Sequence, residues 1–527
     1  MITGKNLIGG HTVSDKGTAF KTFNPQLNQE NDWNFKEATV EEIKAAVGLA
    51  EDAAREYGNL NGTVKARFLR EIATQIEDLG DKLVKVYCQE SGLPEGRAKG
   101  ERGRTCFQLR TFANLVEEGS WVNATIDTAL PDRQPMPKPD LRKMLVPIGP
   151  IAVFGASNFP LAYSTAGGDT ASALAAGCPV IVKSHPMHAA TGELIAHAIL
   201  KAAQLTGMPE GVFSNLNSKG IEVGEELVKQ PGIKGVGFTG SIMGGRALLD
   251  LASRRPEPIP VFAEMGSVNP VILLPEALQH KGAFWAKTYA TSITLGTGQF
   301  CTNPGLLFGI ASEALTAFTN SLSQEMVEIA PACMLHPNIK KNYDSNTSEM
   351  LSQNGVEVVA GPQNAIPIHY AQPILTKVQG SDFLSNPRLH QEVFGPFSMV
   401  VVCKDVKELE TIITNLEGQL TGAIIGEDRE IEHYGDLIAT LKSKVGRLIY
   451  NGAPTGVEVC PAMQHGGPYP ASTDSRFGAV GIHAIQRWVR PVCYQNWPQE
   501  LLPAALKDVN PLGISRLVNA EITSKSL

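Results

Sequence analysis

The sequence predicts an α/β fold that contains parallel sheets, and three observations carry this prediction. Short apolar runs alternate with amphipathic stretches from residue 144 to 264, a spacing typical of parallel βαβ units with right-handed crossovers. A second, less regular alternation extends from Asn269 to about Asn451. The length of 527 residues corresponds to roughly three domain-sized units.

The first part of the chain is expected to be helical. Residues 1 to about 35 are polar and rich in turn formers, and they are expected to lie on the surface as short strands or an arm. Thr39, with Glu42 three residues later, has the pattern of a capping box at a helix start. Further helices are predicted through residues 67–87 and 102–118.

The first alternating region divides into strands and helices between residues 147 and 264. The expected strands are 147–154, 179–182, 211–216, 235–238 and 260–263, and the expected helices are 164–176, 189–205, 222–229 and 243–252. Ligands of parallel sheets bind beyond the carboxyl ends of the strands. Functional residues are therefore expected directly after these strands, at Ser157-Asn158, Lys183-Ser184, Thr239-Gly240-Ser241 and Glu264.

The second region and the remaining loops are less regular. The expected strands are 271–274, 305–310, 357–360, 374–376, 398–403, 421–425 and 447–450. A hinge between two lobes is expected at residues 266–270, and a glycine- and proline-rich loop at 466–470. The proline-dense stretch 132–139 excludes a helix or a central strand. It is either a projecting hairpin or arm, or an ordinary surface loop.

Composition restricts the class of partner. The chain has 43% hydrophobic and 19% charged residues and a net charge of −7, which is typical of a globular protein and disfavours binding to nucleic acid or to an anionic membrane. Neither a membrane-spanning apolar run nor a signal peptide is recognisable. The eight scattered cysteines and the histidines form no metal-ligand spacing, and they fit the reducing cytoplasm. The expected partner is a small molecule, with no metal.

One cysteine, Cys301, stands on a glycine-rich turn at residues 296–305, after an apolar stretch 283–295 that is expected to be a helix or a strand. Glycines allow a tight turn that brings backbone N–H groups close to a bound atom. A thiol on such a turn can attack a carbonyl carbon while its own N–H faces the oxygen that becomes negative. The alternative is a buried structural cysteine.

The turn Phe238-Thr239-Gly240-Ser241 leads into a predicted helix, with Gly245 completing a G-x-x-x-x-G spacing. A helix N-terminus with free N–H groups and a hydroxyl can bind a pyrophosphate. Many βα turns contain glycine, and no Gly-Lys-Ser/Thr of a Walker loop follows. Lys183 can bind ribose hydroxyls or a phosphate, or can be a solvated lysine at a strand end.

Two further strand-end residues complete a possible site. Glu264 in an apolar setting can act as a general base, and the Asn158 amide can donate to an oxyanion. The alternatives are a solvated glutamate and a turn-forming asparagine. Together with Cys301 and a dinucleotide turn, they suit thiol attack on an aldehyde, hydride loss to a nicotinamide, and hydrolysis of the thioester.

In these residues the chain resembles the aldehyde dehydrogenase superfamily over nearly its whole length. The matching positions are the oxyanion asparagine Asn158, the ribose-binding Lys183, the pyrophosphate turn Phe238-Thr239-Gly240-Ser241, the general base Glu264, the nucleophile in Gly298-Gln299-Phe300-Cys301, and the ribose-binding glutamate in Glu392-Val393-Phe394-Gly395-Pro396. The resemblance implies that Cys301 adds to the aldehyde, that Asn158 and the Cys301 N–H hold the oxyanion, and that Glu264 activates the water.

The resemblance also implies the domain layout. We expect a Rossmann-type cofactor-binding domain at 1–265, with a helical opening, an arm at about 120–150 and a sheet at 147–264. An α/β catalytic domain is expected at 266–465, and an oligomerisation segment and tail at 466–527. The arm and the C-terminal segment imply a homodimer or a homotetramer.

The chain departs from the family pattern in ways that bear on the coenzyme. Glu264-Met265-Gly266-Ser267 replaces the usual Glu-Leu-Gly-Gly, and Gly296 replaces a common asparagine. Pro186 stands where many NAD-dependent members carry a glutamate that binds the adenosine ribose. Without that carboxylate, Lys183, Ser184 and His185 can contact a 2′-phosphate. NADP is therefore the preferred coenzyme, with NAD possible.

The C-terminal runs 466–473 and 495–498 are similar to a branch of the family that oxidises 2,5-dioxopentanoate, a semialdehyde with a carboxylate. A fatty or general aldehyde is the alternative substrate. Such a carboxylate needs cationic partners. The candidates near the substrate funnel are Arg102, Arg104 and Arg110, which can also be a solvated helix face, together with Phe159, Tyr163, Phe300 and Thr302.

Other functions remain open on the same residues. A thioesterase or acyltransferase would use Cys301 and Glu264 without a dinucleotide. A CoA-dependent acylating enzyme would replace water as the acceptor, and Glu264 favours water. A silent binding protein would not need Cys301, Glu264 and Asn158 together.

Overall fold

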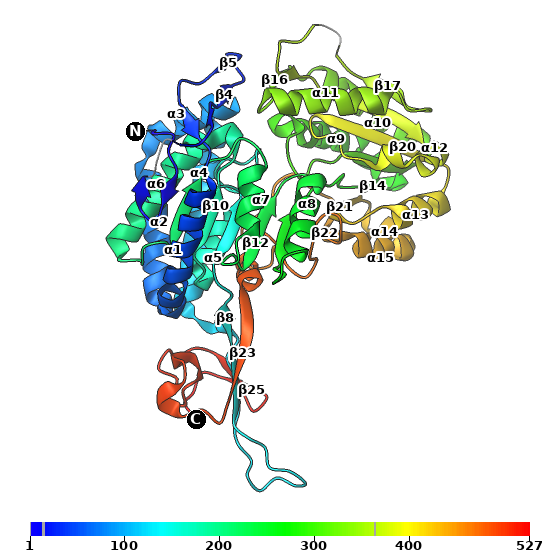
Figure 1. The fold of residues 1–527 in the computed structure, drawn as a ribbon. Coiled ribbons are helices and arrows are strands. Elements are labelled where there is room, and N and C mark those ends of the chain that lie inside the picture. Colours follow the sequence, from blue (N-terminus) through cyan, green and yellow to red (C-terminus); the bar gives the residue numbers. More distant parts are fainter. Residues whose placement is uncertain (1, 13–15, 363–364) are drawn as a thin grey trace.

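The computed structural model describes residues 2–12, 16–362 and 365–527. Figure 1 shows two lobes side by side and an arm that projects from their base. Each lobe is a mainly parallel sheet covered by helices, which confirms the predicted α/β class. No helix within the described residues is long and apolar enough to cross a membrane.

The helical opening comprises α1 (Val40–Asn59), α2 (Gly62–Asp78), α3 (Gly80–Ser91) and α4 (Glu95–Glu118). The predicted capping box is present: the Thr39 side chain accepts from Glu42 N, and the Glu42 carboxylate accepts from Thr39 N. The single helix expected through residue 87 is divided at Leu79, because Gly80 adopts a positive φ of 53°. Helix α4 begins directly after the extended Pro94, earlier than predicted.

The sheet of the first lobe has the strand order β13-β12-β9-β10-β11-β1-β2. Its parallel strands are β9 (Ile151–Phe154), β10 (Val180–Lys183), β11 (Phe213–Leu216), β12 (Gly235–Thr239) and β13 (Val261–Glu264). The short β1 (Leu7–Ile8) adds antiparallel to β11, and β2 (His11–Thr12) pairs with β1. The strands are apolar along most of their length because helices cover both faces.

Helices α1, α7 (Glu222–Lys229) and α8 (Ile242–Ser253) pack on one face of this sheet. Helices α5 (Gly168–Ala176) and α6 (Ala189–Thr206), with α2 to α4 behind them, pack on the other. Helix α5 begins at Gly168 and not at residue 164, because the preceding segment is held as a loop. The Glu101 carboxylate accepts from the backbone N–H groups of Leu161 and Ala162 within that loop.

The sheet of the second lobe has the order β17-β19-β20-β15-β14-β21-β22. Its strands are β14 (Val271–Leu273), β15 (Leu306–Ile310), β17 (Glu357–Ala360), β19 (Ile374–Gln379), β20 (Phe397–Cys403), β21 (Gln419–Ile425) and β22 (Val445–Tyr450), and all pairs except β17·β19 are parallel. Helices α9 (Pro275–Thr294) and α10 (Glu313–Val327) cover one face. Helices α11 (Pro337–Leu351), α12 (Gly380–Ser385), α13 (Val406–Asn415) and α15 (Gly435–Lys444) contribute to the core on the other.

The arm is a third sheet with the order β23-β8-β7-β24-β25. It consists of β7 (Thr125–Asp127), β8 (Leu141–Pro147), β23 (Val489–Gln495), β24 (Arg516–Val518) and β25 (Glu521–Thr523). Of the two alternatives for the proline-dense stretch 132–139, a projecting hairpin and a surface loop, the structure has the hairpin. A bridge between Leu130 and Lys138 closes it, and it forms the tip of the arm in Figure 1.

After the second sheet the chain returns to the first lobe before it reaches the arm. Residues 471–473 lie along β13, since Met265 N donates to Ala471 O at 2.8 Å and Thr473 N donates to Ala263 O at 3.1 Å. The 3₁₀ helix η6 (Ile482–Trp488) then packs near α5, where the Trp488 Nε1 donates to the Ser172 hydroxyl at 2.8 Å. This return, the loop 451–481, places His465 beside Glu264 at the carboxyl end of β13, and Gly466 and Gly467 against the first residues of β22 and β21.

Candidate active site

The carboxyl ends of the first sheet and the Cys301 turn share one cavity of about 290 Å³. It extends from the N-terminus of α8 to Cys301. Its lining includes Asn158, Thr239, Gly240, Ser241, Glu264, Gly266, Cys301, Tyr343, Glu392 and Phe394. The structure therefore brings the predicted catalytic residues and much of the predicted coenzyme turn to one place.

The backbone around Cys301 is held in an unusual turn. The stretch 283–295 is helical, as the end of α9, and the 3₁₀ turn η3 (Leu295–Gly298) follows it. Gly296, Thr297 and Gly298 all have positive φ, and a Cβ on Gly298 would approach Gly395 to 2.3 Å. The buried Asn269 side chain donates from Nδ2 to Cys301 O at 2.8 Å, and this hydrogen bond holds the turn in place.

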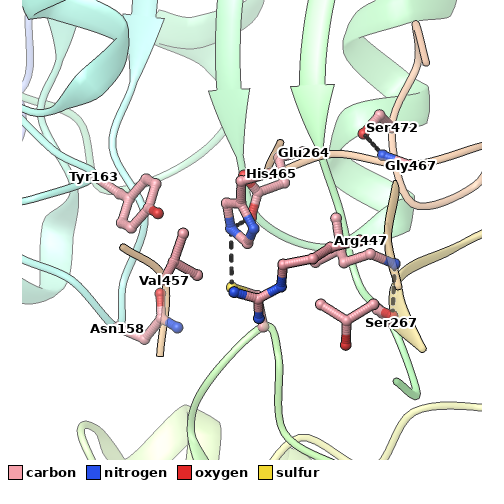
Figure 2. Close-up of polar contacts among 12 residues, drawn as sticks. Asn158, Tyr163, Glu264, Ser267, Arg447, Val457, His465, Gly467 and Ser472 are labelled. Carbon is pink, nitrogen blue, oxygen red and sulfur yellow. Dashed lines mark hydrogen bonds and ion pairs between the residues drawn. The ribbon is translucent and has the colours of Figure 1, made fainter. Parts of the chain in front are cut away.

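The partly exposed Cys301 lies beside two buried reactive side chains, His465 and Glu264 (Figure 2). His465 Nε2 lies 3.5 Å from Cys301 Sγ and 2.8 Å from Glu264 Oε1, so the imidazole connects the thiol to the carboxylate. The side chains of His465 and Glu264 are only 1% and 4% exposed. Burial, and next the nearby Glu264 charge, raises the pKa of the Cys301 thiol well above its usual range. The resting nucleophile is therefore a thiol that needs a proton acceptor.

Sequence reasoning missed His465. It lies 164 positions from Cys301 in a loop, and its neighbours form no motif that indicates chemistry. Its backbone O accepts from Ala479 N at 2.7 Å, which ties it to the returning segment beside β13. The only available signal was its place next to the glycine-rich run 466–470, which the chain uses to cross back over the sheet.

The three ligand-type atoms of Glu264, Cys301 and His465 lie within 4.8 Å of one another. Such a set resembles the ligands of a thiophilic cation, although no metal motif was found in the sequence. The same closeness allows a proton to pass between the thiol, the imidazole and the carboxylate.

Asn158 lies next to the turn that carries Cys301. Its Nδ2 donates to Gln299 O at 3.0 Å, two residues before Cys301. Its amide therefore lies beside the turn from which the sulfur projects, in the same cavity. An amide donor at this position can stabilise negative charge that develops on a carbonyl oxygen attached to the sulfur.

The coenzyme end of the cavity is built on α8. Ser241 is the N-cap and accepts from Gly244 N at 3.1 Å, and the residues of the first turn of α8 are largely exposed. A Cβ on Gly240 would approach the Phe238 ring to 2.6 Å, and a Cβ on Gly245 would approach Met265 Sδ to 2.5 Å. Phe238 therefore supports the turn from within, packed against Phe154, and the Gly240 N–H donates to Glu264 O at 3.0 Å.

Lys183, Ser184 and His185 follow β10 in different environments. Burial lowers the pKa of the half-buried Lys183 to about 8, with the Glu37 carboxylate acting in the opposite direction. The Ser184 hydroxyl is buried against Gly192, where a Cβ would come within 3.3 Å of it. His185 accepts from Met187 N through Nδ1 at 3.3 Å, and burial holds its pKa well below the usual range, so the ring is neutral at pH 7.

Glu392 faces the cavity across from the α8 turn. A Cβ on Gly266 would come within 2.4 Å of Glu392 Oε2, so only glycine at 266 leaves room for this carboxylate. Burial raises the pKa of Glu392 to about 7. Phe394 lies near it in the cavity wall. An exposed helix N-terminus at one end of the cavity and a carboxylate near Cys301 fit the pyrophosphate and ribose of a dinucleotide.

An aromatic cluster lies on the other side of Cys301. Phe159 packs against Tyr163 and Phe300, with ring centroids 5.1 and 5.4 Å apart, and residues of the loop 457–463 complete the cluster. Phe300, directly before the cysteine, belongs to this cluster, which lies where the substrate funnel is expected. Thr302 is buried and does not line the cavity around Cys301.

The three candidate arginines of α4 have different surroundings. Arg110 forms an ion pair with Glu77 at 2.6 Å, and Arg102 donates to Gly80 O at 3.1 Å, so both belong to the outer helix packing. Arg104 alone points to the funnel: it donates to the Tyr163 hydroxyl at 3.0 Å and to Val457 O at 2.9 Å.

Comparison with known proteins identifies relatives along almost the entire chain. A model of the aldehyde dehydrogenase family matches residues 12–489. Alpha-ketoglutaric semialdehyde dehydrogenase of Acinetobacter baylyi is 47% identical over 521 residues, which cover 99% of each protein. Alpha-ketoglutaric semialdehyde dehydrogenase 2 of Azospirillum brasilense is 45% identical over 517 residues, or 98% of each. A solved 1-pyrroline-5-carboxylate dehydrogenase from Thermus with bound NAD has a TM-score of 0.78 at 20% identity, covering 93% of this chain and 92% of that one.

Proposed function

The chain belongs to the aldehyde dehydrogenase family, whose members oxidise aldehydes to carboxylates with NAD(P), and we propose that its substrate is 2,5-dioxopentanoate and its product 2-oxoglutarate. Family membership confirms the resemblance found in the sequence. The observation that carries the proposal is the Cys301–His465–Glu264 group, placed between the aromatic cluster and the cavity that extends to the N-terminus of α8. The substrate is supported by the names of the two relatives that match nearly end to end.

In the proposed first step, Cys301 Sγ bonds to the aldehyde carbon and the carbonyl π electrons move to oxygen. The thiol proton passes to His465 Nε2, 3.5 Å away, and the Glu264 carboxylate, 2.8 Å from the same nitrogen, stabilises the imidazolium. Asn158 Nδ2 and the Cys301 backbone N–H donate to the oxyanion. The raised pKa of Cys301 makes this proton acceptor necessary.

A nicotinamide coenzyme would supply the hydride acceptor for the thiohemiacetal carbon, and Cys301 would then carry a thioester. On the protein side, the N-terminus of α8 would hold the pyrophosphate, and Lys183 and Glu392 would hold the two riboses. In the last step Glu264 takes a proton from water, the water oxygen adds to the thioester carbon, and the C–S bond breaks. The carboxylate leaves and Cys301 recovers its proton.

NADP is the proposed preferred coenzyme, since Pro186 leaves Lys183 without a carboxylate three positions further along the chain. A separate observation favours NAD. The Glu37 carboxylate acts electrostatically on Lys183 and accepts from Lys219 N at 2.7 Å, so an acidic group from another element stands near the lysine. The buried Ser184 hydroxyl and the neutral His185 ring add little attraction for a 2′-phosphate.

The substrate proposal is tested with the purified full chain, both coenzymes and a panel of aldehydes, by following absorbance at 340 nm. We expect kcat/KM for 2,5-dioxopentanoate to exceed that for hexanal and decanal by at least about tenfold. Equal or higher values with the neutral aldehydes would favour a fatty or general aldehyde dehydrogenase. No absorbance change with any aldehyde would favour a thioesterase or acyltransferase.

A homodimer or homotetramer in the cytoplasm is proposed for the assembled enzyme. The arm exposes large apolar side chains, among them Met136 at 68% and Ile522 at 80%, which a neighbouring subunit would cover. The eight cysteines are all free thiols, consistent with a reducing compartment.

A further inference from the structure

Two guanidinium groups near Cys301 lack a carboxylate partner. Three arginines of α2 and α4 have a carboxylate partner: Arg97 pairs with Glu101, Arg70 with Glu117 and Arg110 with Glu77. Within the residues that the structure describes, Arg104 and Arg447 form no ion pair. A partly buried cation without a counter-charge is costly in the free protein, so these two arginines require an explanation.

Arg104 reaches the funnel from α4. Its Nη2 donates to the Tyr163 hydroxyl at 3.0 Å, and its guanidinium lies 5.4 Å from the centre of the Tyr163 ring. Its Nη1 donates to Val457 O at 2.9 Å, while its Nε is buried and has no hydrogen-bond partner among the described residues. The Tyr163 oxygen accepts from Arg104, which leaves the phenolic proton free for an acceptor in the funnel.

Arg447 reaches the same place from β22, the edge strand of the other lobe. Nη2 donates to Pro454 O at 2.5 Å and Nη1 donates to Gly456 O at 3.0 Å, so it holds carbonyls directly before the one that Arg104 holds. Its Nε is also buried and without a partner in the described part of the chain. In Figure 2 its side chain extends toward the sulfur contacted by His465, and the guanidinium interacts electrostatically with Cys301 and Tyr163.

Electrostatics around these groups favour an anion at one particular place. Burial lowers the pKa of Arg447, which shows that its charge is poorly solvated. The buried Glu264 carboxylate lies 2.8 Å from His465, whose ring centroid is 6.0 Å from that of Tyr163, so it would repel an anion bound between Tyr163 and His465. A negatively charged ligand end in the funnel would gain two cations, while its neutral aldehyde end would occupy the position next to the sulfur and avoid Glu264.

We propose that Arg104, Arg447 and the Tyr163 hydroxyl form an anion subsite that binds the distal carboxylate of a short ω-oxo acid. The inference rests on the proposed function and deepens it by naming the residues that select the substrate. In 2,5-dioxopentanoate three carbons separate the carboxylate carbon from the aldehyde carbon, so charge at the subsite fixes the aldehyde at Cys301. The arginines act on substrate position and not on the transfer of hydride.

The decisive comparison uses a matched pair of aldehydes, 5-oxopentanoate and pentanal, which have the same carbon chain and differ in the carboxylate. The readout is the ratio of their kcat/KM values in wild type, Arg447→Gln, Arg104→Gln and Tyr163→Phe. We expect each arginine substitution to lower the ratio by about 10- to 100-fold, mainly through KM of the acid, and Tyr163→Phe to lower it by about threefold to tenfold. Arg110→Gln, on the outer face of α4, is the matched control and should keep the wild-type ratio.

A second readout is independent of coenzyme and turnover. Pentanoate, which has one carboxylate and an uncharged end, should slow the alkylation of Cys301 by iodoacetamide in the wild type, and this protection should be lost in Arg447→Gln. Because both arginines also hold the loop 454–457, Arg447→Lys keeps the charge and tests whether it partly restores the ratio and the protection. Thermal melting within a few degrees of wild type shows that each variant is folded.

The failures of the two proposals are distinguishable. A wild type that prefers pentanal would refute the ω-oxo acid substrate and with it the subsite. A wild type that prefers the acid, with ratios unchanged in both arginine variants, would refute the subsite alone. An equal loss with both aldehydes would also refute it, because it would assign the arginines to the reactivity of the Cys301 thiol.

Discussion

The two ends of the Cys301 cavity are built on different principles. The coenzyme end consists of strand ends of one parallel sheet, and it offers backbone N–H groups, glycines and few charges. The substrate end is assembled from α4, the loop before α5, β22 and the loop 451–481, and it offers aromatic rings, two arginines and His465. One end depends on the path of the backbone, and the other depends on side chains carried by loops.

This difference has a consequence for specificity. At the coenzyme end, a Cβ on Gly240 or Gly245 would collide with the core, so the binding turn cannot change without disturbing the sheet. At the substrate end, the loop 451–481 is attached by side-chain contacts from Arg104 and Arg447. The substrate end can therefore vary while the sheet, the turn and the coenzyme contacts stay the same.

The largest expected effect tests whether both ends meet at Cys301. Cys301→Ala should lower kcat by about 10⁶-fold, because no other nucleophile is placed at the junction. Coenzyme binding should be retained, since the α8 turn does not depend on the sulfur. Steady-state assays at 340 nm and a titration of coenzyme fluorescence measure the two quantities. Measurable turnover in this variant would remove Cys301 from the chemistry, and lost coenzyme binding would show that the two ends are not separable.

The next largest effect is expected for Glu264, whose carboxylate contacts His465 at the substrate end of the cavity. Glu264→Gln should lower kcat by about 10³-fold and leave an acyl-enzyme, because water is no longer activated. A burst of one reduced coenzyme per site, followed by a stall, is the expected time course. A variant that turns over without a stall would assign the activation of water to another group.

The same substitution has an opposite effect on the free thiol. The Glu264 charge raises the pKa of Cys301, so its removal lowers that pKa and increases the thiolate fraction at neutral pH. Iodoacetamide should therefore alkylate Glu264→Gln faster than wild type at pH 7, although turnover is lower. Slower alkylation would show that Glu264 activates the thiol in the resting enzyme.

The sequence predicted the coenzyme end better than the substrate end for a physical reason. Asn158, Lys183 and Glu264 each follow a buried strand, and parallel strands bring such residues together at one edge. Position relative to a strand therefore sufficed to group them. It did not predict the direction of a side chain. The Ser184 hydroxyl points into the core against Gly192, and Arg110 of α4 points to Glu77 on the outside of the lobe.

His465 and Arg447 could not be found in this way. Arg447 lies on a predicted strand, where an arginine on an edge is ordinarily solvated, and His465 lies in a loop without periodicity. Their positions depend on how the returning chain crosses from one lobe to the other, which is set by contacts between residues far apart in the sequence. Local pattern contains no information on such a crossing.

A smaller effect separates the roles of His465 and Glu264. His465→Gln should lower the rate of the burst, which reports formation of the thioester, by about 10²-fold, because glutamine cannot accept the thiol proton. Hydrolysis should be affected less, since Glu264 remains. Stopped-flow measurement of the burst and of the steady state gives both rates, with His188→Gln as the control, because His188 Nε2 donates to Ala156 O at 2.8 Å and not to the Cys301 group. A slower steady state with an unchanged burst would place His465 in hydrolysis instead.

The smallest expected effect is at the coenzyme end, where Glu37 acts on Lys183. Glu37→Gln should raise the NADP-to-NAD ratio of kcat/KM at pH 7 by about fivefold, because removing a partly exposed charge near the 2′-position changes binding by about 1 kcal/mol.

The pH dependence of KM for NADP depends on the same two residues, Glu37 and Lys183. Lys183, with a pKa of about 8, loses its charge as the pH rises through that value, so KM for NADP should increase above pH 8. Since Glu37 favours the charged lysine, Glu37→Gln should move this increase to lower pH, whereas a pH profile that stays in place would show that Glu37 does not act on the coenzyme through Lys183.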